Sequence, residues 1–412
     1  MLLLLSACLY ISDGEVLGRL GDDTAIRDDT GGDDTGNGAL VYADADGDGS
    51  GDPATALPEG EAPVGYVDNS WDCDDTDATE PVWADAAAGT DRSVGTMEDP
   101  FGLISDAITA AERCINVRGG TYMENLKLPG RSLSIVGVDG AKATFVTSAA
   151  KDAVVEITGA ATVSLTGMTL MNGTGVTAGT DYTLGDGINI AYSSLTLTDV
   201  TLTNNEATSG GGLYASVSTV TLDGVWFQDN VAYDGAGFAQ SSSTIQGEQV
   251  WIVGNEGEYA TAANLFGGTT TLQDLVVNAN RGNIGTDGIL VDVGTLTLTN
   301  ATFVDMDTAL EFSTSTISLN GVAMTAVDRA MYGFNEVIVT MAWSTLYKAE
   351  VAAEYADGGG NLDEDPLFTA LSEDGDWTND TLTLQSGSPC IDAGDPSLAD
   401  ADGSRADMGA RI

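Results

Sequence analysis

Histidine is absent from the 412 residues of this chain. Imidazole titrates near neutral pH and serves as general base, nucleophile or metal ligand in many sites, so its absence excludes every mechanism that depends on it. Basic residues are also scarce, because 14 Lys and Arg stand against 63 Asp and Glu and give a net charge of −49. This composition strongly disfavours binding to nucleic acid, or to an anionic membrane surface through a basic patch.

Long hydrophobic runs are missing as well, and no stretch approaches the roughly 18 apolar residues of a transmembrane helix. The chain begins with a leucine run that ends in Leu-Ser-Ala-Cys at Cys8, which resembles the lipobox of bacterial lipoproteins. In that family the cysteine thiol is acylated and becomes the mature N-terminus. The resemblance implies that residues 1–8 are a signal-peptide remnant with Cys8 as the lipidation site. It also implies that the lipid holds the protein at the bacterial cell envelope, on the outer membrane or cell surface.

Cysteine is rare in the rest of the chain, which contains only Cys73, Cys114 and Cys390. These three residues can pair or stay buried as thiols, and the sequence leaves both possibilities open.

Acidic residues are concentrated near the N-terminus, where residues 1–85 contain 21 acids and two bases. Within residues 9–40 the triplet Asp-Asp-Thr recurs three times among glycines, with almost nothing apolar to bury. Such a segment gains too little from burial to fold, and its charges repel one another. We therefore predict a disordered acidic tether over residues 9–40.

Residues 41–85 predict a small calcium-binding module. Asp44, Asp46 and Asp48 followed by Gly49 match the first half of a calcium loop, but Thr55 replaces the bidentate glutamate expected at position 12 of an EF-hand. The whole stretch instead resembles the metal-binding motif of bacterial surface proteins, written roughly YxDxDGDGxGD…GYV…DCDDTD, although the usual second cysteine between the halves is missing. The resemblance implies calcium as the cofactor, with Asp44, Asp46, Asp48, Asp52, Asp72, Asp74, Asp75 and Asp77 as ligands. The competing interpretation is a merely acidic linker.

A repeat of apolar residues at i, i+2, i+5 and i+7 runs through the middle of the chain. One copy comprises Leu195, Leu197, Val200 and Leu202. Strand alternation with a one-residue phase slip predicts two short strands that meet at a bend. The second apolar residue of each copy is Leu165, Leu197, Leu222, Gly247, Leu272, Leu298, Leu319 and Val339, in steps of 32, 25, 25, 25, 26, 21 and 20 residues. A period in the twenties predicts a solenoid that buries its core only collectively.

Asparagine recurs at the same period, at Asn205, Asn230, Asn255 and Asn280. Side chains stacked at one turn can hydrogen-bond to one another along the column. We predict a structural ladder rather than catalytic residues.

Residues 88–145 resemble the opening of a pectin-lyase-like β-helix, through Gly89-Thr90-Asp91, Asp99-Pro100-Phe101 and Gly119-Gly120-Thr121-Tyr122. Asp99 as N-cap and Pro100 at the first helical position predict a helix. Its apolar face would comprise Phe101, Ile104, Ala107, Ile108 and Ala111 and cover the open end of the stack. The predicted fold class is therefore all-β: a single-stranded right-handed parallel β-helix over residues 86–350, with an N-terminal capping helix and the acidic module.

Residues 351–412 resemble the closing segment of secreted bacterial β-helix proteins of the choice-of-anchor type. The resemblance rests on the stretch from Ser388 to Asp395 and on residues 402–410. Arg405 stands among three aspartates of this segment, which predicts a structural ion pair. No C-terminal anchor is expected, in agreement with a lipid at Cys8.

Two features indicate where a ligand could bind. Trp226, Trp251 and Trp343 fall four residues after their repeat anchors, which predicts one outer row suited to sugar rings or to another protein, unless a loop or the tail covers it. The 32-residue step predicts a protruding loop with Asp181 and Tyr182, although a plain length variation is the alternative.

Catalysis finds little support in the sequence. Between residues 160 and 340 the only basic residues are Arg281 and Arg329, with no carboxylate trio beside either. The Gly-His-Gly element of polygalacturonase-like sites is absent, and so is the Arg-Pro-Trp element of pectin-methylesterase-like sites. We therefore predict a non-catalytic cell-surface β-helix that is structural, adhesive or polysaccharide-binding. The alternative is an atypical carbohydrate-active enzyme, similar to a lyase or hydrolase, that acts on acidic polysaccharide.

Overall fold

The computed structural model describes residues 40–47, 49–52, 55–58, 63–73, 79–88, 93–111, 113–175 and 183–411. The predictions for Cys8, the tether before residue 40, Asp48, Asp74, Asp75, Asp77, Asp181 and Tyr182 fall outside these residues. In the described part of the chain, no helix is long and apolar enough to cross a membrane.

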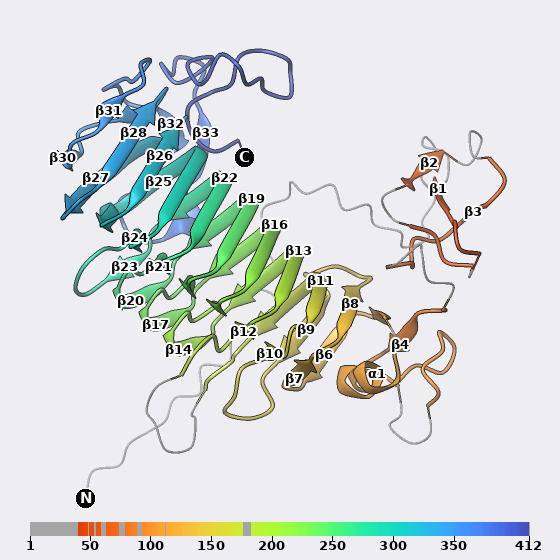
Figure 1. Cartoon of the computed structure of the whole chain (residues 1–412). Coiled ribbons are helices and arrows are strands. Elements are labelled where there is room, and N and C mark those ends of the chain that lie inside the picture. Colours follow the sequence, from red (N-terminus) through yellow and green to blue (C-terminus); the bar gives the residue numbers. More distant parts are fainter. Residues whose placement is uncertain are drawn as a thin grey trace, which may run out of the picture. The chain divides into compact units, whose positions relative to one another are not determined.

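A right-handed parallel β-helix forms most of the described chain, as predicted (Figure 1). Its strands pair in parallel with the strands one turn before and after, and together they make one 24-stranded sheet that winds through three faces. Parallel pairing in register produces such a stack, because each turn then places equivalent residues above one another, even where turns differ in length.

Face 1 begins with short strands and continues in the first halves of six long strands. It comprises β4 (Val82–Ala84), β5 (Cys114–Val117) and β8 (Ser132–Gly137), the first halves of β11 (Thr162–Met171), β13 (Ser194–Thr203), β16 (Thr219–Gln228), β19 (Thr244–Val253), β22 (Thr269–Asn278) and β25 (Thr295–Ser313), and then β26 (Thr316–Asn320), β28 (Ile338–Ala342) and β31 (Ala356–Asp357).

Face 2 follows the bend within the long strands. It comprises β6 (Gly120–Met123), β9 (Thr144–Thr147), the second part of β11, β13, β16, β19, β22 and β25, the start of β27 (Ala323–Phe334), and β29 (Thr345–Leu346).

Face 3 returns the chain to the next turn. It comprises β7 (Leu126–Pro129), β10 (Val155–Thr158), β12 (Ile188–Ala191), β15 (Leu213–Ser216), β18 (Phe238–Ser241), β21 (Ala263–Phe266), β24 (Ile289–Asp292), the ends of β25 and β27, and β30 (Glu350–Ala352). Between faces 2 and 3, a parallel four-stranded sheet is built from β14 (Glu206–Ser209), β17 (Val231–Asp234), β20 (Glu256–Tyr259) and β23 (Arg281–Gly282).

The predicted register is confirmed for all turns but the last. The anchor residue of each turn pairs with the anchor residue of the next turn. In order, the paired anchors are Leu165, Leu197, Leu222, Gly247, Leu272, Leu298 and Leu319. Leu319 then pairs with Met341, so the last step is 22 residues and the alignment to Val339 was wrong. The stack also extends beyond the predicted range of 86–350, because it starts with β4 and ends with β31.

One residue with a left-handed backbone conformation stands at the bend of each long strand. It explains the one-residue phase slip in the sequence pattern. Asp199, Gln249, Asp274 and Asn300 occupy this corner with φ of 50° or 51°. Such a φ turns the chain sharply, so inward positions resume three residues later instead of two. Aspartate, asparagine and glycine tolerate this conformation better than most residues, which accounts for their frequency here.

The core is one continuous column of apolar side chains inside the three faces. Leu197, Leu272 and Leu298 are fully buried. At Gly247 the missing side chain leaves room that Leu272 fills, since a Cβ at Gly247 would stand 2.7 Å from the Leu272 Cδ2 atom.

The asparagine ladder is confirmed. The Nδ2 of Asn205 donates to the Oδ1 of Asn230 at 3.0 Å, Asn230 to Asn255 at 3.1 Å, and Asn255 to Asn280 at 2.8 Å. All four residues are fully buried, so every amide finds its partners inside the stack.

Helix α1 (Ile104–Ala110) packs Ile104, Ala107 and Ile108 against the core, as the apolar pattern predicted. Asp99 is not its N-cap, because Leu103 takes that position without a side-chain bond. The Glu124 carboxylate instead accepts the amide N–H groups of Ile104 and Ser105, at 2.7 and 2.9 Å. A carboxylate from a neighbouring turn therefore replaces the local cap.

The C-terminal segment folds back over face 2. It contains the antiparallel pair β32 (Phe368–Ala370) and β33 (Thr381–Leu384) and the short 3₁₀-helix η3 (Trp377–Asn379). Phe368 and Leu382 form an apolar cluster with Val276 and Val304 of face 2. Outward residues of this face are consequently buried.

Candidate functional site

The acidic module is built on a small sheet of β1 (Leu40–Ala43), β2 (Leu57–Pro58) and β3 (Tyr66–Val67). Directly after β1, the Asp44 carboxylate accepts the amide N–H groups of Gly47 and Gly49, at 2.7 and 3.3 Å. Both glycines have positive φ, of 82° and 93°, so the chain wraps around Asp44 as a calcium loop does.

The two halves of the predicted metal motif lie side by side. Strand β1 pairs with β3, the amide Nδ2 of Asn69 donates to the carbonyl of Gly49 at 3.0 Å, and the N–H of Asp72 donates to the carbonyl of Gly51 at 3.2 Å. Asp72 is only 5% exposed. Thr55 hydrogen-bonds to the backbone of Ala43 and Asp52, which gives it a structural role.

The described carboxylates do not complete a metal site alone. Among the residues whose structure is described, no group of three or more His, Cys, Asp or Glu could hold a metal ion. Four of the eight predicted ligands, Asp48, Asp74, Asp75 and Asp77, are outside that set. The fold thus brings the segment after β1 alongside the backbone of Asp72, and the full ligand set stays a prediction.

A disulfide between Cys73 and Cys114 ties the module to the first turn of the β-helix, and their Cα atoms are 5.7 Å apart. Next to it, the Nδ2 of buried Asn116 donates to the carbonyl of Trp71 at 2.8 Å. The Trp71 ring meets Trp83 of β4 edge to face, with centroids 5.4 Å apart. These contacts join the end of the metal motif directly to β4 and β5.

Trp226 and Trp251 are neighbours on face 2, as the repeat predicted. Their ring centroids are 4.5 Å apart and their planes differ by 5°. Two indoles this close and this parallel lie face to face, so their edges point outward. Trp377 of the tail stands 6.1 Å from Trp226, and Trp251 packs against the apolar cluster under the tail. Both tryptophans are half-buried.

Trp343 does not belong to this row, which corrects the prediction. The outer column runs from Trp226 through Trp251, Val276, Thr302 and Ala323 to Thr345. Trp343 occupies the left-handed corner, with φ of 51°, because the last turn is two residues longer than predicted. The Arg405 guanidinium covers its ring at 4.7 Å and donates to the carbonyls of Ala393 and Gly394 rather than pairing with the predicted aspartates.

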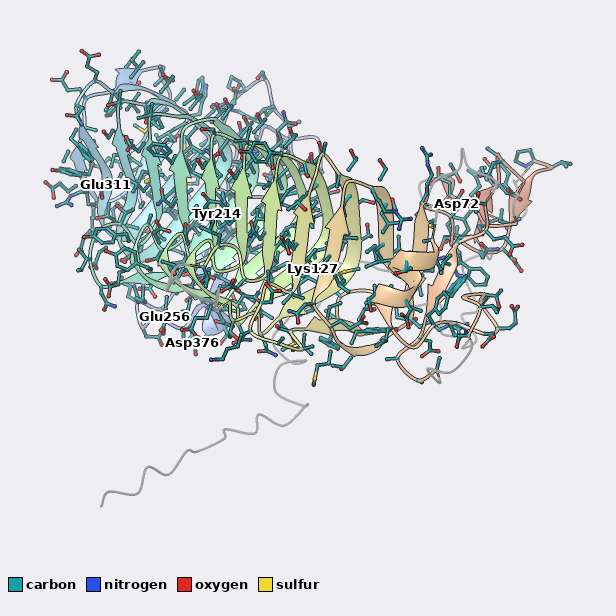
Figure 2. All side chains as sticks on the ribbon, turned by 60° about the horizontal axis from the view of Figure 1, so that its bottom comes forward. Asp72, Lys127, Tyr214, Glu256, Glu311 and Asp376 are labelled. Carbon is teal, nitrogen blue, oxygen red and sulfur yellow. A yellow bond between two sulfur atoms is a disulfide. The ribbon has the colours of Figure 1, made fainter. Side chains whose placement is uncertain are left out.

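Face 3 carries an outward column that the sequence analysis did not single out. Its members are Lys127, Glu156, Asn189, Tyr214, Ala239, Asn264, Leu290, Glu311 and Tyr332. Figure 2 shows Lys127, Tyr214 and Glu311 following one another along the stack. Lys127 bridges Asp152 and Glu156, with its Nζ 2.9 and 2.5 Å from their oxygens.

Asp234 is a half-buried acid beside this column. Burial raises its pKa, although hydrogen bonds from Ser209 and Asn264 oppose the shift. The Nδ2 of Asn264 lies 3.2 Å from the carboxylate. Nearby, the rings of Tyr233 and Tyr259 are 5.4 Å apart and exposed. Only the period of the repeat, which brings residue 234 alongside 209 and 259, could have indicated this grouping.

The two central arginines have structural partners. Arg281 donates to the Asp305 carboxylate at 2.7 Å, and the second oxygen of Asp305 accepts the N–H of Gly375 in the tail. Arg329 lies 3.6 Å from Glu350 and over the ring of Tyr332. Asp186, at the base of the predicted loop, is buried and accepts the N–H of Gly175, and burial raises its pKa.

No protein-family model and no curated protein matches the chain. Similar solved structures include pectin methylesterase PemA from Erwinia chrysanthemi, with 10% identity over 69% of this chain and 93% of that one and a TM-score of 0.38. Pectate lyase Pel9A matches with 14% identity over 81% and 96%, at a TM-score of 0.40. The GH87 α-1,3-glucanase catalytic unit of Streptomyces thermodiastaticus strain HF3-3 has 15% identity over 63% and 65%, at 0.30.

The activities of these neighbours are properties of those proteins. The parallel β-helix of this chain rests on its own strand pairing.

Proposed function

We propose that the protein is a non-catalytic β-helix of the bacterial cell envelope, lipid-anchored at Cys8, with a structural or adhesive role and a calcium-stabilised N-terminal module. The single observation that carries the proposal is the convergence of the Asp44 loop and Asp72, two halves of an acidic motif that the sequence separates by more than twenty residues. A cation bound between the two halves would offset the repulsion between their carboxylates.

Calcium would act on the β-helix through the module's attachment. The module ends at Cys73, whose disulfide leads into β5, and at Trp71, which packs on Trp83. Ordering Asp72 and its neighbours would therefore order the first turn, which has no preceding turn to stack on. Oxygen ligands from Asp44, Asp46, Asp52 and Asp72, together with the four acids beyond the described residues, suit this hard cation.

The test is calorimetric titration of the full chain with calcium, together with its melting temperature in calcium, magnesium and chelator. We expect heat of binding and a calcium-specific rise in melting temperature, both weakened in Asp72→Asn and Asp46→Asn. Glu98→Gln removes one exposed acid outside the module and is the matched control. Absence of calcium binding by the wild type, or equal weakening by Glu98→Gln, would contradict the proposal.

Adhesion to polysaccharide at Trp226 and Trp251 is the finer part of this proposal. Since the two rings cover each other's faces, a sugar would reach mainly their edges and the neighbouring Trp377. Glycan-array binding by the wild type that is lost in Trp226→Ala, without turnover of the glycan, would support it. Binding unchanged in Trp226→Ala and Trp251→Ala would place adhesion elsewhere. Alanine variants of the predicted loop residues Asp181 and Tyr182 are compared with the wild type in the same glycan-array assay.

An atypical carbohydrate-active enzyme is the second candidate, and Asp234 favours it. Burial raises the pKa of this carboxyl group, which is the direction that a general acid needs, and the Tyr233 and Tyr259 rings lie on the same turns of the stack. Release of uronate or reducing ends from acidic polysaccharide, abolished in Asp234→Asn, would support this candidate. Arg281→Ala is a poor test, because its guanidinium holds Asp305.

A further inference from the structure

Face 1 presents two adjacent outward columns made almost entirely of hydroxyl residues. The first column is Ser132, Thr162, Ser194, Thr219, Thr244, Thr269, Thr295, Thr316 and Ile338. The second column is Ser134, Ser164, Thr196, Thr221, Gln246, Thr271, Thr297, Ser318 and Thr340. Sixteen of these eighteen positions are therefore Ser or Thr, and none is buried. We refer to the two columns as the hydroxyl lattice.

The hydroxyl lattice contains no charged residue, although 19% of the whole chain is charged. The next column on the same face, towards the bend, already carries Asp223 and Glu248. The outward column of face 3 contains Lys127, Glu156 and Glu311. The β-propensity of threonine would favour it at outward positions of every face, so it does not explain a composition confined to one face.

The geometry of the hydroxyl lattice is regular in two directions. Successive turns pair without a register shift from β8 to β28, which spaces the members of a column about 4.8 Å apart. The two columns are two residues apart along each strand, or about 6.6 Å. Threonine is stiff at χ1, and the strands beneath are fixed by buried residues such as Leu197 and Leu272, so the threonine hydroxyl and methyl groups repeat at the strand spacing. At the N-terminal end of the lattice the hydroxyls of Ser134 and Ser164 instead hydrogen-bond to each other at 2.6 Å.

The tail leaves the hydroxyl lattice open while it covers face 2. Threonines 196, 219, 221, 244, 269 and 271 are all exposed. On face 2, by contrast, Thr302 is 2% exposed and its hydroxyl accepts the N–H of Ala410 from the tail. The described residues thus leave the lattice uncovered, while the tail closes the equivalent surface of face 2.

The chemistry of the hydroxyl lattice restricts its partner. Asp223 and Glu248 at its border would repel a polyanion, and the lattice itself has no carboxylate to pair with a polycation, so a neutral partner fits it best. The lattice offers no aromatic ring for a sugar to stack on. Hydrogen bonds to a soluble ligand would replace bonds to water and gain only about 0.5–1.5 kcal/mol each. A partner that is itself ordered water avoids this exchange, because the hydroxyl groups then take positions that water would occupy.

We propose that the hydroxyl lattice is an ice-binding surface, which adsorbs to a face of crystalline water. Its hydroxyl groups repeat in two directions across one face, as water oxygens do on a face of hexagonal ice. The Thr methyl groups between the hydroxyls restrict the orientation of first-layer water, and the hydroxyls anchor that layer by hydrogen bonds. This activity is independent of the calcium and polysaccharide binding proposed above.

The experiment uses the purified full chain with calcium present. Slow growth of ice from a dilute solution measures incorporation of the protein into the crystal, and ice recrystallisation is followed by microscopy. We expect the wild type to be incorporated and to slow recrystallisation, and Thr221→Lys with Thr271→Lys to lose both effects. The double variant Thr221→Val with Thr271→Val keeps the shape of the side chains but removes two hydroxyl groups. We expect it to weaken both effects on ice.

Two controls separate the lattice from other surfaces. Asn189→Lys places the same charge on face 3, and Trp226→Ala alters the tryptophan pair; both should behave as the wild type. Circular dichroism melting confirms that each variant is folded. Exclusion of the wild type from ice, an equal loss in Asn189→Lys, or adsorption to an insoluble neutral polysaccharide without any effect on ice would each overturn the proposal.

Discussion

The Arg411 side chain donates two hydrogen bonds to the Asp274 carboxylate, although the two residues are 137 positions apart in the sequence. Its Nε donates to one carboxylate oxygen at 2.9 Å and its Nη2 donates to the other at 2.7 Å. The Asp274 side chain is 4% exposed at the left-handed corner between β22's two halves, while Arg411 is about one-third exposed. The end of the tail is therefore fastened to the middle of the stack.

Removal of this guanidinium should loosen the tail. In Arg411→Ala the buried Asp274 carboxylate loses its charged partner and keeps only the N–H of residue 411 and the Gln273 amide. We expect the free energy of unfolding to fall by about 1–2 kcal/mol, less than for a fully buried pair because Arg411 is partly hydrated. Urea denaturation measures the change, and limited proteolysis should cut the tail sooner. Lys142→Ala removes an exposed charge elsewhere and should change neither readout. An unaltered denaturation curve in Arg411→Ala would show that the Arg411–Asp274 pair does not contribute to the free energy of unfolding.

The asparagine ladder should be sensitive at its middle. Asn230 receives a bond from Asn205 and donates to Asn255 and to the carbonyl of Leu202, all within the buried interior. Asn230→Ala removes the acceptor for the backbone N–H and one side-chain N–H of Asn205 and the donor to the Leu202 carbonyl, so we expect a loss of about 2–4 kcal/mol in denaturation experiments. Asn189→Ala on the surface is the control, with a change of about 0.5 kcal/mol or less. Equal losses of stability in the two variants would contradict a stabilising role for the asparagine ladder.

The repeat allowed the fold to be predicted because a strand buries alternate residues, so apolar spacing fixes which residues face inward. The same property caused the error in the last turn. Val339 and Met341 both face inward, and a shift of two residues keeps the same side chains inside, so only strand pairing distinguishes them. Trp343 was consequently assigned to the wrong column.

Features formed between distant segments could not be read from local patterns. Glu124 caps α1 from twenty residues downstream, and the tail covers face 2 through Phe368 and Leu382. The acidic motif predicted that Asp44 and Asp72 belong together, and the β1–β3 pairing places their segments side by side. The pairing of Cys73 with Cys114, rather than Cys390, depends on how the module docks on β5.

That disulfide should stabilise the start of the stack. It closes a loop of 41 residues, for which the lost chain entropy of the unfolded state predicts about 2–4 kcal/mol. We expect Cys73→Ser to lower the melting temperature, and a reductant to lower that of the wild type but not of the variant. Cys390 should not exchange with the pair, since it is buried and burial raises the pKa of its thiol to about 11. A reductant effect that persists in Cys73→Ser would assign the stabilisation to another source.

Asp199 should make the stability depend on pH. Burial, and then the charge of Asp223, raise the pKa of this corner carboxyl above its ordinary value of 3.8. The folded chain therefore binds the proton more readily than the unfolded chain, so a destabilising effect is present above the folded pKa. It disappears as the pH falls through that pKa towards 3.8.

Asp199→Asn removes this effect without disturbing the bend, because Asn300 occupies the same left-handed corner elsewhere in the stack. We expect the variant to be more stable than the wild type at pH 7, by a few tenths of a kcal/mol since the group is partly hydrated. The difference should shrink as the pH is lowered to about 4. Thermal melts of both proteins across this range measure it, and the wild type corrects for the fall in overall net charge. An advantage of the variant that grows towards low pH would contradict the assigned sign.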